Sequence, residues 1–303
     1  MSATVLCVGH AAYDLSVFVE NFPEENSKAE IEEMLESGGG PAANAAWLLA
    51  TWGTPCAFAG LVGDDHYGHR VRAELERAGV DVSLLQLQPH HATPLSVILV
   101  NRQTGSRTIV NRKLRGAVLK LDAAALAGFS PAVLLFDGHE LDASLAALQA
   151  FPDAVSILDA GSWREGTAAL AGKVNYLVAS ERFARQATGC GELRDDSARR
   201  ACITKLRERF PTTVVVTLGE HGLIADDGAG FRHLPAFLAR TVDTTGAGDI
   251  FHGAFAFAVA HAMPLWEGLR FASMAASLSV RAPGGRASFP PLAKVQEALA
   301  HAG

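Results

Sequence analysis

Short apolar runs recur along the chain, and longer stretches with helical character separate them. The runs cover residues 5–9, 57–62, 133–136, 155–158, 176–178 and 214–217. Continuous apolar runs of this kind are typical of strands buried on both faces of a parallel sheet. Helices are expected over residues 41–52, 68–78 and 250–262. The alternation predicts an α/β fold with three layers, in which helices cover both faces of a mostly parallel sheet.

Two segments depart from this alternation, and their patterns predict strands with no helix between them. Residues 95–100 and 107–111 flank Gln103-Thr104-Gly105-Ser106, which is the pattern of a β-hairpin. The earlier segment, from about residue 16 to residue 36, is also β-like but more polar. We therefore expect a single domain over residues 1–303 with a small β-sheet lid, formed by insertions at about 15–37 and 94–115.

Composition narrows the class of protein. Of the 303 residues, 49% are hydrophobic and 19% are charged, and the formal net charge is −6 at pH 7. This acidic balance argues against nucleic acid as a partner, because non-specific binding needs surplus Lys and Arg. No run approaches the roughly 20 apolar residues of a membrane helix, and the N-terminus lacks the basic start of a signal peptide. We expect a cytoplasmic protein that acts on small molecules.

The most informative stretch for function is Asp243-Thr244-Thr245-Gly246-Ala247-Gly248-Asp249, at the start of a predicted helix. Small residues at 246–248 let backbone N–H groups approach a phosphate at the helix start. Asp249 then stands beside that anion, where a carboxylate suits a base that takes a proton from an attacking alcohol. The alternative is a carboxylate that only compensates the helix dipole. This stretch alone leaves both interpretations open.

Several blocks of the sequence resemble the ribokinase-like carbohydrate kinases, the PfkB family. Residues 243–251 resemble the C-terminal signature of that family, and Gly39-Gly40-Pro41-Ala42-Ala43-Asn44 resembles its N-terminal signature. Supporting matches are Asp14 after the first strand and residues 60–68 and 217–222. The blocks follow the family's order over nearly the whole chain. The resemblance implies a three-layer α/β/α ribokinase-like fold with a small β-sheet lid.

The resemblance also implies a role for each matching position. The base would be Asp249, and the anion hole would be formed by Gly246, Ala247 and Gly248. Sugar hydroxyls would be held by Asp14, Gly39, Gly40 and Asn44, and ATP would lie along Thr217, Gly219 and Gly222. Members commonly need Mg²⁺, and many bind a monovalent cation such as K⁺ near the positions of Asp243, Thr245 and Ser288. In many members the lid also forms a homodimer.

One departure from the family pattern concerns the metal and the phosphates. Many members carry Asn-x-x-Glu in this region, whereas the corresponding stretch here is Ser180-Glu181-Arg182-Phe183. Both fixed residues are therefore missing. Glu181 is the candidate that would reach the water shell of the metal instead.

Some details resemble one branch of the family, the sulfofructose kinases, close to the fructokinases. They are the triple glycine at 38–40, the Ser180-Glu181 variant and residues 283–287. Lys28 and Asn111 match positions that this branch uses to bind the sulfonate. An Arg expected after the strand at 133–136 is absent, and Gly138-His139-Glu140 stands in its place.

The charge of the acceptor therefore stays open. The basic residues Arg112, Lys113 and Arg115 could replace the missing Arg, or the acceptor is a neutral sugar. We predict an ATP-dependent kinase that phosphorylates a primary hydroxyl of a ketose-type sugar, fructose-like or sulfofructose-like. The alternatives are another acceptor, such as 2-keto-3-deoxygluconate, ribose or a nucleoside, and a non-catalytic protein that binds sugar or nucleotide.

Overall fold

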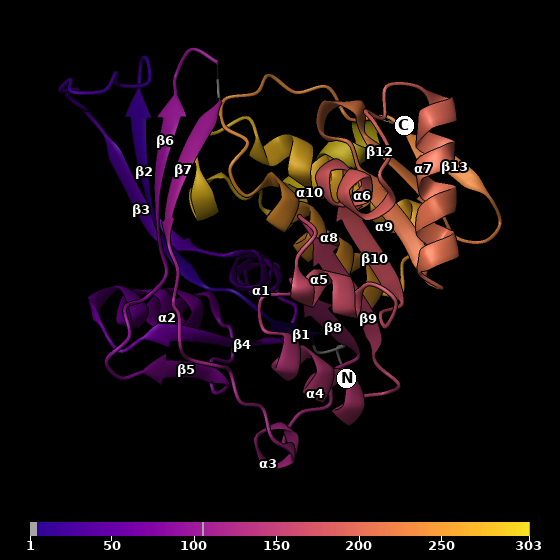
Figure 1. Ribbon diagram of the computed structural model, residues 1–303, viewed down its shortest axis with the longest axis horizontal. Coiled ribbons are helices and arrows are strands. Elements are labelled where there is room, and N and C mark those ends of the chain that lie inside the picture. The colour runs from indigo at the N-terminus through magenta and orange to yellow at the C-terminus, as the bar shows by residue number, and fades with distance from the viewer. Residues whose placement is uncertain (1–4, 105, 303) are drawn as a thin grey trace.

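The main body of the protein is built on a nine-stranded sheet (Figure 1). The structure is a computed structural model that describes residues 5–104 and 106–302. The strand order is β13-β12-β11-β10-β9-β8-β1-β4-β5, and all neighbours from β5 to β11 pair in parallel. The strands are β1 (Val5–Val8), β4 (Cys56–Gly63), β5 (Leu85–Gln88), β8 (Val133–Phe136), β9 (Val155–Ala160), β10 (Tyr176–Ser180), β11 (Thr213–Thr217), β12 (Leu223–Asp226) and β13 (Phe231–Leu234).

Two hydrophobic cores, one on each face of this sheet, hold the helices in place. Along β1, Val5 and Cys7 belong to the first core, whereas Leu6 and Val8 belong to the second, because side chains alternate between the faces. The first core receives α1 (Pro41–Thr51), α2 (His66–Ala78), α8 (Ala247–Ala260), α9 (Leu265–Ser279) and α10 (Leu292–His301). The second receives α3 (Ala123–Leu126), α4 (Leu141–Ala150), α5 (Glu165–Leu170), α6 (Glu181–Thr188) and α7 (Asp196–Arg209). The three-layer α/β prediction is confirmed.

A separate four-stranded sheet forms the lid, at the left of Figure 1. Its order is β3-β2-β6-β7, with β2 (Ala12–Val19), β3 (Met34–Gly39), β6 (Leu95–Asn101) and β7 (Arg107–Arg112). The predicted hairpin is present as the antiparallel pair β6 and β7, and β6 also pairs in parallel with β2. Gly105, in the predicted turn, lies outside the described residues. Phe18, Ile98 and Val100 form a small core of their own on one face of the lid.

Three strands of the main sheet were not predicted from the sequence. β5 has the sequence Leu-Gln-Leu-Gln, and β12 and β13 form an antiparallel hairpin at one edge. β12 has the sequence Leu-Ile-Ala-Asp and ends in a charged residue, and β13 has the sequence Phe-Arg-His-Leu with two polar residues in the middle. Neither strand therefore gives the run of four apolar residues that marks β1 or β8. Among the helices of the described residues, none is both long and apolar enough to cross a membrane.

Candidate active site

The site lies where the order of the strands in the sheet reverses direction. From β1 the strand order runs one way to β4 and β5 and the other way to β8 and β9. Ligands of open parallel sheets bind at such a switch point, beyond the carboxyl ends of the strands. The segment after β1 enters the lid, and the turn after β8 begins with Asp137. The fold therefore brings lid and main sheet together at this point.

Asp249 stands in the first turn of α8, directly after the glycine segment that begins the helix. Gly246 has φ 77°, a left-handed conformation that favours glycine, and it is the N-cap residue. The Nδ2 group of Asn44, on α1, donates a hydrogen bond to Oδ2 of Asp249 at 2.7 Å. Asp249 is partly exposed and Gly248 is exposed, so the carboxylate and this part of the loop are open to a ligand.

The orientation of Asn44 is set by a second hydrogen bond. Nε of Arg286 donates to Oδ1 of Asn44 at 3.1 Å, and Nη1 of Arg286 donates to Oε2 of Glu74 at 2.9 Å. The same Glu74 oxygen accepts from the backbone N–H of Gly38 at 2.7 Å. Glu74 and Arg286 were not among the predicted site residues, because more than two hundred positions separate them along the chain.

Although Asp249 is partly exposed, protein atoms surround most of its carboxyl group, and this sets its protonation behaviour. Loss of water around the carboxyl group raises its pKa from 3.8 to about 7, and the negative charge of Asp159 adds to this rise. The hydrogen bond from Asn44 and the nearby His252 act in the opposite direction. Asp14 is close enough for its charge to raise the pKa of Asp249 slightly further. A carboxyl group with a pKa near neutrality is well matched to a general base.

Asp14 lies on β2 of the lid, against the backbone of the glycine segment. A Cβ added to Gly39 would stand 1.9 Å from Oδ2 of Asp14, so only glycine leaves room for this carboxylate. Burial raises the pKa of Asp14, whereas the hydroxyl of Ser96 and the charge of Arg286 lower it. A Cβ on Gly40 would stand 2.4 Å from the carbonyl oxygen of His10. The glycines thus bring Asp14 and α1 close together.

The loop before α8 is organised by a buried carboxylate. Asp243 is 2% exposed, and its two oxygens accept from the backbone N–H groups of Thr245 at 2.8 Å and Gly284 at 2.9 Å. Ser288 Oγ donates to the carbonyl oxygen of Gly285 at 2.8 Å. Within the described part of the chain, Oγ1 of Thr245 is buried without a hydrogen-bond partner. The structure therefore gathers Asp243, Thr245 and the segment of Ser288 around one loop.

The residues predicted for the nucleotide lie at the carboxyl ends of β10 and β11. Ser180 pairs with Thr217, so Glu181 at the start of α6 follows the strand next to Thr217. Gly219 has φ 59°, and Gly222 has φ 84°. A Cβ on Gly222 would stand 2.1 Å from the carbonyl oxygen of Leu234, so this turn requires glycine.

The two residues expected to bind a sulfonate lie apart. Asn111 pairs with Ser96 and Ser96 with Asp14, which places these three residues in one row on the same face of the lid. Lys28 is exposed in the loop between β2 and β3, at the end of β2 farthest from Asp14. The lid therefore brings Asn111, but not Lys28, toward the row of Asp14.

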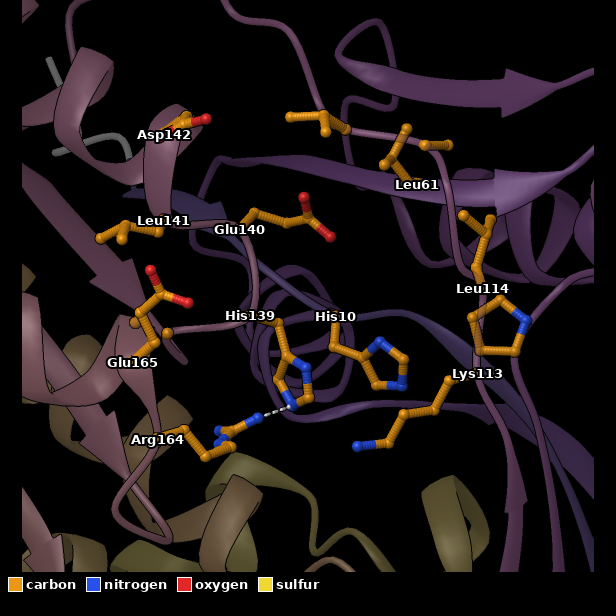
Figure 2. Close-up of a pocket in the computed structure, with 15 residues that line it drawn as sticks. His10, Leu61, Lys113, Leu114, His139, Glu140, Leu141, Asp142, Arg164 and Glu165 are labelled. Carbon is orange, nitrogen blue, oxygen red and sulfur yellow. Dashed lines mark hydrogen bonds between the residues drawn. The ribbon is translucent and has the colours of Figure 1, made fainter.

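A cavity of about 470 Å³ opens beside this site, at the ends of β1 and β8 (Figure 2). The rings of His10 and His139 stack there with centroids 4.5 Å apart. Nη1 of Arg164 contacts Nε2 of His139, and Nη2 donates to the carbonyl oxygen of Asp137 at 3.0 Å. Figure 2 shows Lys113 reaching toward the same group from the opposite wall. An Arg was expected after β8, and Arg164, which follows β9, brings its guanidinium group to that turn instead. Arg164 was not among the predicted site residues.

Asp137 anchors this corner of the cavity. Its carboxylate accepts from the backbone N–H groups of His10 at 2.7 Å and His139 at 2.9 Å. A Cβ on Gly9 would stand 2.2 Å from Asp137, which leaves no room for a side chain there. Burial lowers the pKa of His10 to about 3, with His139 adding to the effect, and burial also lowers the pKa of His139. The imidazole of His10 is therefore neutral at physiological pH, and burial favours the neutral form of His139 as well.

Comparisons with known proteins report on the family and the fold of the chain. A family model described as "pfkB family carbohydrate kinase" matches residues 2–292. A ribokinase of Haemophilus influenzae is 24% identical over the full length of both chains, and a nucleoside kinase of Methanothermobacter thermautotrophicus is 29% identical over 94% of this chain and 92% of that protein. A protein of Agrobacterium tumefaciens assigned as a ribokinase superposes with a TM-score of 0.91 at 28% identity, covering 99% of this chain and 98% of the other.

The comparisons confirm the expected family and fold but not the expected branch. The relatives above are named as ribokinases or as a nucleoside kinase, whereas the sequence details had pointed to the fructokinases and sulfofructose kinases. The names thus favour the alternative acceptors over a ketose. The triple glycine and the tail at 283–287 set the structure of the loop and of Arg286, so these details alone do not identify the acceptor.

Proposed function

This chain belongs to the pfkB family of carbohydrate kinases, and on that basis we propose that it transfers the γ-phosphate of ATP to a primary hydroxyl of a sugar of the ribose type. The observation that carries the proposal is the hydrogen bond from Asn44 to Asp249 at the start of α8. It holds a carboxylate of raised pKa in the first turn of α8, beside the backbone N–H groups at the start of that helix. The names of the relatives favour an aldopentose acceptor.

The reaction requires a base, an acceptor and a phosphate at one place. As the acceptor oxygen forms its bond to the γ-phosphorus, its proton passes to Asp249, and the bond between the γ-phosphorus and the bridging oxygen of ADP breaks. The backbone N–H groups of Gly246, Ala247 and Gly248 stabilise the negative charge that builds on the transferring group. Asp14, Asn44, Gly39 and Gly40 orient the hydroxyls of the sugar.

The nucleotide would lie along the turn that follows β11, on Thr217, Gly219 and Gly222. No group of three or more His, Cys, Asp or Glu residues in the described ranges could hold a metal ion alone. This fits Mg²⁺, which usually keeps several waters and binds the substrate phosphates with one or two carboxylates. Glu181 is partly exposed and follows Ser180, the strand partner of Thr217, and one of its oxygens accepts from the backbone N–H of Leu193. It is the carboxylate that would reach the water shell of the ion. When bound, Mg²⁺ neutralises charge on the phosphates.

A monovalent cation such as K⁺ would be held near the loop of Asp243. The buried hydroxyl of Thr245, which has no partner among the residues described, is a suitable oxygen ligand. Ser288 adds a second hydroxyl on the neighbouring segment. Both oxygens of Asp243 already accept backbone hydrogen bonds, so its carboxylate would contribute mainly charge and loop geometry.

A ketose or an acidic sugar derivative is the second candidate acceptor. The observation that favours it is the pair Lys113 and Arg164 in the cavity next to the site. Cations that face a ligand cavity suit an anionic substituent at the far end of the acceptor. Glu140, Asp142 and Glu165 also line the cavity and weaken this preference. We therefore rank it below a neutral sugar.

An acceptor panel tests the proposal directly. ADP release would be measured with ribose, 2-deoxyribose, fructose, sulfofructose, 2-keto-3-deoxygluconate and a nucleoside, with and without Mg²⁺ and K⁺. We expect the highest kcat/KM with ribose or a closely related sugar. The second candidate is supported if fructose, sulfofructose or the keto acid is preferred. Sugar binding without ADP release from any acceptor would refute the kinase proposal and indicate a non-catalytic binding protein.

A further inference from the structure

Arg286 is a buried cation that the family signatures leave without a role. It lies in the 3₁₀ turn η2 (Gly285–Ser288) and is 5% exposed. Its carboxylate partner is Glu74, on α2, at 2.9 Å. A buried guanidinium normally has all its N–H groups hydrogen-bonded. Within the part of the chain that the structure describes, Nη2 of Arg286 is buried and has no partner.

The planar guanidinium fixes where this free group points. Nε–H and one N–H of Nη2 lie along the same edge and form a fork that can bind oxygens in parallel. Nε donates to Oδ1 of Asn44, so Nη2 lies on the edge that faces Asn44. Nη1, on the other edge, is occupied by Glu74. The free donor is therefore turned toward the side chain that binds Asp249.

Two carboxylates lie close enough to Arg286 for their charges to act on it. The charge of Arg286 lowers the pKa of Asp14, and the charges of both Asp14 and Asp249 act on Arg286. The structure gives neither carboxylate a hydrogen bond to Arg286. A ligand oxygen that accepts from Nη2 and donates its own proton to a carboxylate satisfies both partners. A sugar hydroxyl has this combination of donor and acceptor.

Arg286 also decides which end of the Asn44 amide faces the base. The oxygen and nitrogen of an amide side chain are distinguished by their hydrogen-bond partners. Because Nε of Arg286 can only donate, the Asn44 oxygen faces Arg286, and Nδ2 faces Asp249. With the amide reversed, an oxygen would face the carboxylate and repel it. The path from Glu74 through Arg286 and Asn44 thus ends at the catalytic carboxylate.

We propose that Arg286 is the positioning residue that holds Asn44 and so aims Asp249, and that its free Nη2 group binds a hydroxyl oxygen of the acceptor. This inference rests on the proposed function, since it assigns a determinant of acceptor choice in the same site. It predicts that the protein discriminates against acceptors that lack this hydroxyl, and that Arg286 is the residue responsible. The ligand class is a polyol with a free hydroxyl near the phosphorylated group, and not an anion.

Three substitutions separate the charge of Arg286 from its geometry. Arg286→Gln removes both the charge and the geometry, and Arg286→Lys keeps the charge but cannot form the fork. Glu74→Gln removes the counter-charge but keeps a side-chain oxygen that accepts from Gly38 and Arg286. The matched control is Arg199→Lys, because Arg199 is also a buried arginine, 8% exposed, but lies on α7 and donates to the carbonyl oxygen of Leu193. Thermal unfolding would be recorded for all four variants.

The pH profile of kcat/KM is the readout that a purely structural role would not move. Loss of a nearby cation disfavours the charged form of Asp249, so Arg286→Gln moves the acidic limb of the kcat/KM profile to higher pH. In the same variant kcat falls about 10²-fold, because Asp249 loses its orientation. Arg286→Lys lowers kcat about as much but leaves the limb near its wild-type position. Glu74→Gln moves the limb to lower pH, because a negative charge is removed. Arg199→Lys changes neither quantity.

Deoxy sugars test the second half of the proposal. For each hydroxyl of the best acceptor, kcat/KM would be compared with that of the analogue lacking it, in the wild-type protein and in Arg286→Gln. One hydroxyl is expected to give at least tenfold discrimination in the wild type that disappears in the variant. If Arg286→Gln keeps both the wild-type limb and the wild-type discrimination, the inference is wrong. If that variant does not fold, an unchanged limb in Glu74→Gln, or wild-type kcat and discrimination in Arg286→Lys, overturns the inference instead. A wild-type protein that phosphorylates no acceptor overturns the proposed function instead.

Discussion

Two opposing influences set the pKa of Asp249. Removal of water and the charge of Asp159 favour its protonated form, whereas the hydrogen bond from Asn44 favours the charged form. The balance leaves its pKa at about 7. At this value the group is ionised in half of the molecules near neutral pH and still basic enough to take a proton in the transition state.

Replacement of this carboxylate tests its role as base. We expect Asp249→Asn to lower kcat by about 10²–10⁴-fold, because the amide cannot accept the proton of the acceptor hydroxyl. Nucleotide affinity, measured by calorimetry, is expected to stay within a few-fold of wild type. Asp153→Asn, at an exposed position, is the control and should leave kcat unchanged. Near-normal turnover of Asp249→Asn would rule out the base assignment.

The raised pKa of Asp249 predicts opposite effects of pH on activity and on stability. Activity requires the carboxylate, so kcat/KM falls about tenfold per pH unit below about pH 7. Stability changes in the other sense: between pH 4 and 7 the folded protein keeps a proton that the unfolded chain has lost, so this group's contribution falls as pH rises through that window.

The Asp249→Asn variant provides the comparison for both effects, because its amide does not titrate. Denaturant unfolding at a series of pH values should show that this variant gains stability relative to wild type from about pH 4 up to pH 7, with no further gain above that. A difference between the two proteins that does not vary with pH would contradict the raised pKa.

At the scale of elements, the contact between α1 and α8 places the two key side chains opposite each other. Gly253 of α8 lies against α1, and a Cβ there would stand 3.0 Å from Cα of Ala45 and 3.1 Å from Leu48. Ala45 is the residue next to Asn44, and Gly253 is one turn beyond Asp249. Close packing of the helices at this point therefore determines the distance between the amide and the carboxylate.

Separation of these helices should reduce activity. We expect Gly253→Val to displace α8 from α1 and to lower kcat/KM by about 10- to 100-fold, since small misplacements of catalytic groups are costly. The control is Gly191→Ala, in a loop where an added Cβ contacts nothing within 4 Å. If Gly253→Val keeps full activity, the helix contact does not set the geometry of the base.

Local sequence patterns predicted the elements whose signal lies in neighbouring residues. β1 and β8 were found because all their residues are buried and apolar, and the start of α8 was found because glycines and Asp249 stand in one short segment. Arg286 and Arg164 were missed, because their partners Asn44 and His139 lie far away along the chain. Contacts of this kind depend on the assembled fold, which no local pattern contains.

At the scale of the whole molecule, the lid has two faces with different tasks. The row of Asp14, Ser16 and Phe18 faces the body, where Ser16 lies near Gly284. Strand alternation places another row on the opposite face. Leu15 of this row packs against the first core of the main body, whereas farther along the strands cross-strand pairing joins Val17, Met34, Val97, Leu99 and Val110. Met34 is 46% exposed and Val110 is 64% exposed. We propose that this apolar outer face is the contact of a homodimer, because exposed apolar patches of this kind mark interaction sites.

A charge on the outer face should separate the subunits. We expect Val110→Lys to change the mass in solution, measured by light scattering after size-exclusion chromatography, from twice the chain mass of 31.9 kDa to that of one chain. Leu238→Lys is the matched control, because Leu238 is 95% exposed and lies outside the lid. If the lid needs its partner to stay closed over the acceptor, KM for the sugar rises in Val110→Lys while kcat at saturation changes less. A wild-type protein that is monomeric throughout the concentration range of the assay would exclude this dimer, and the outer face of the lid would then need another explanation.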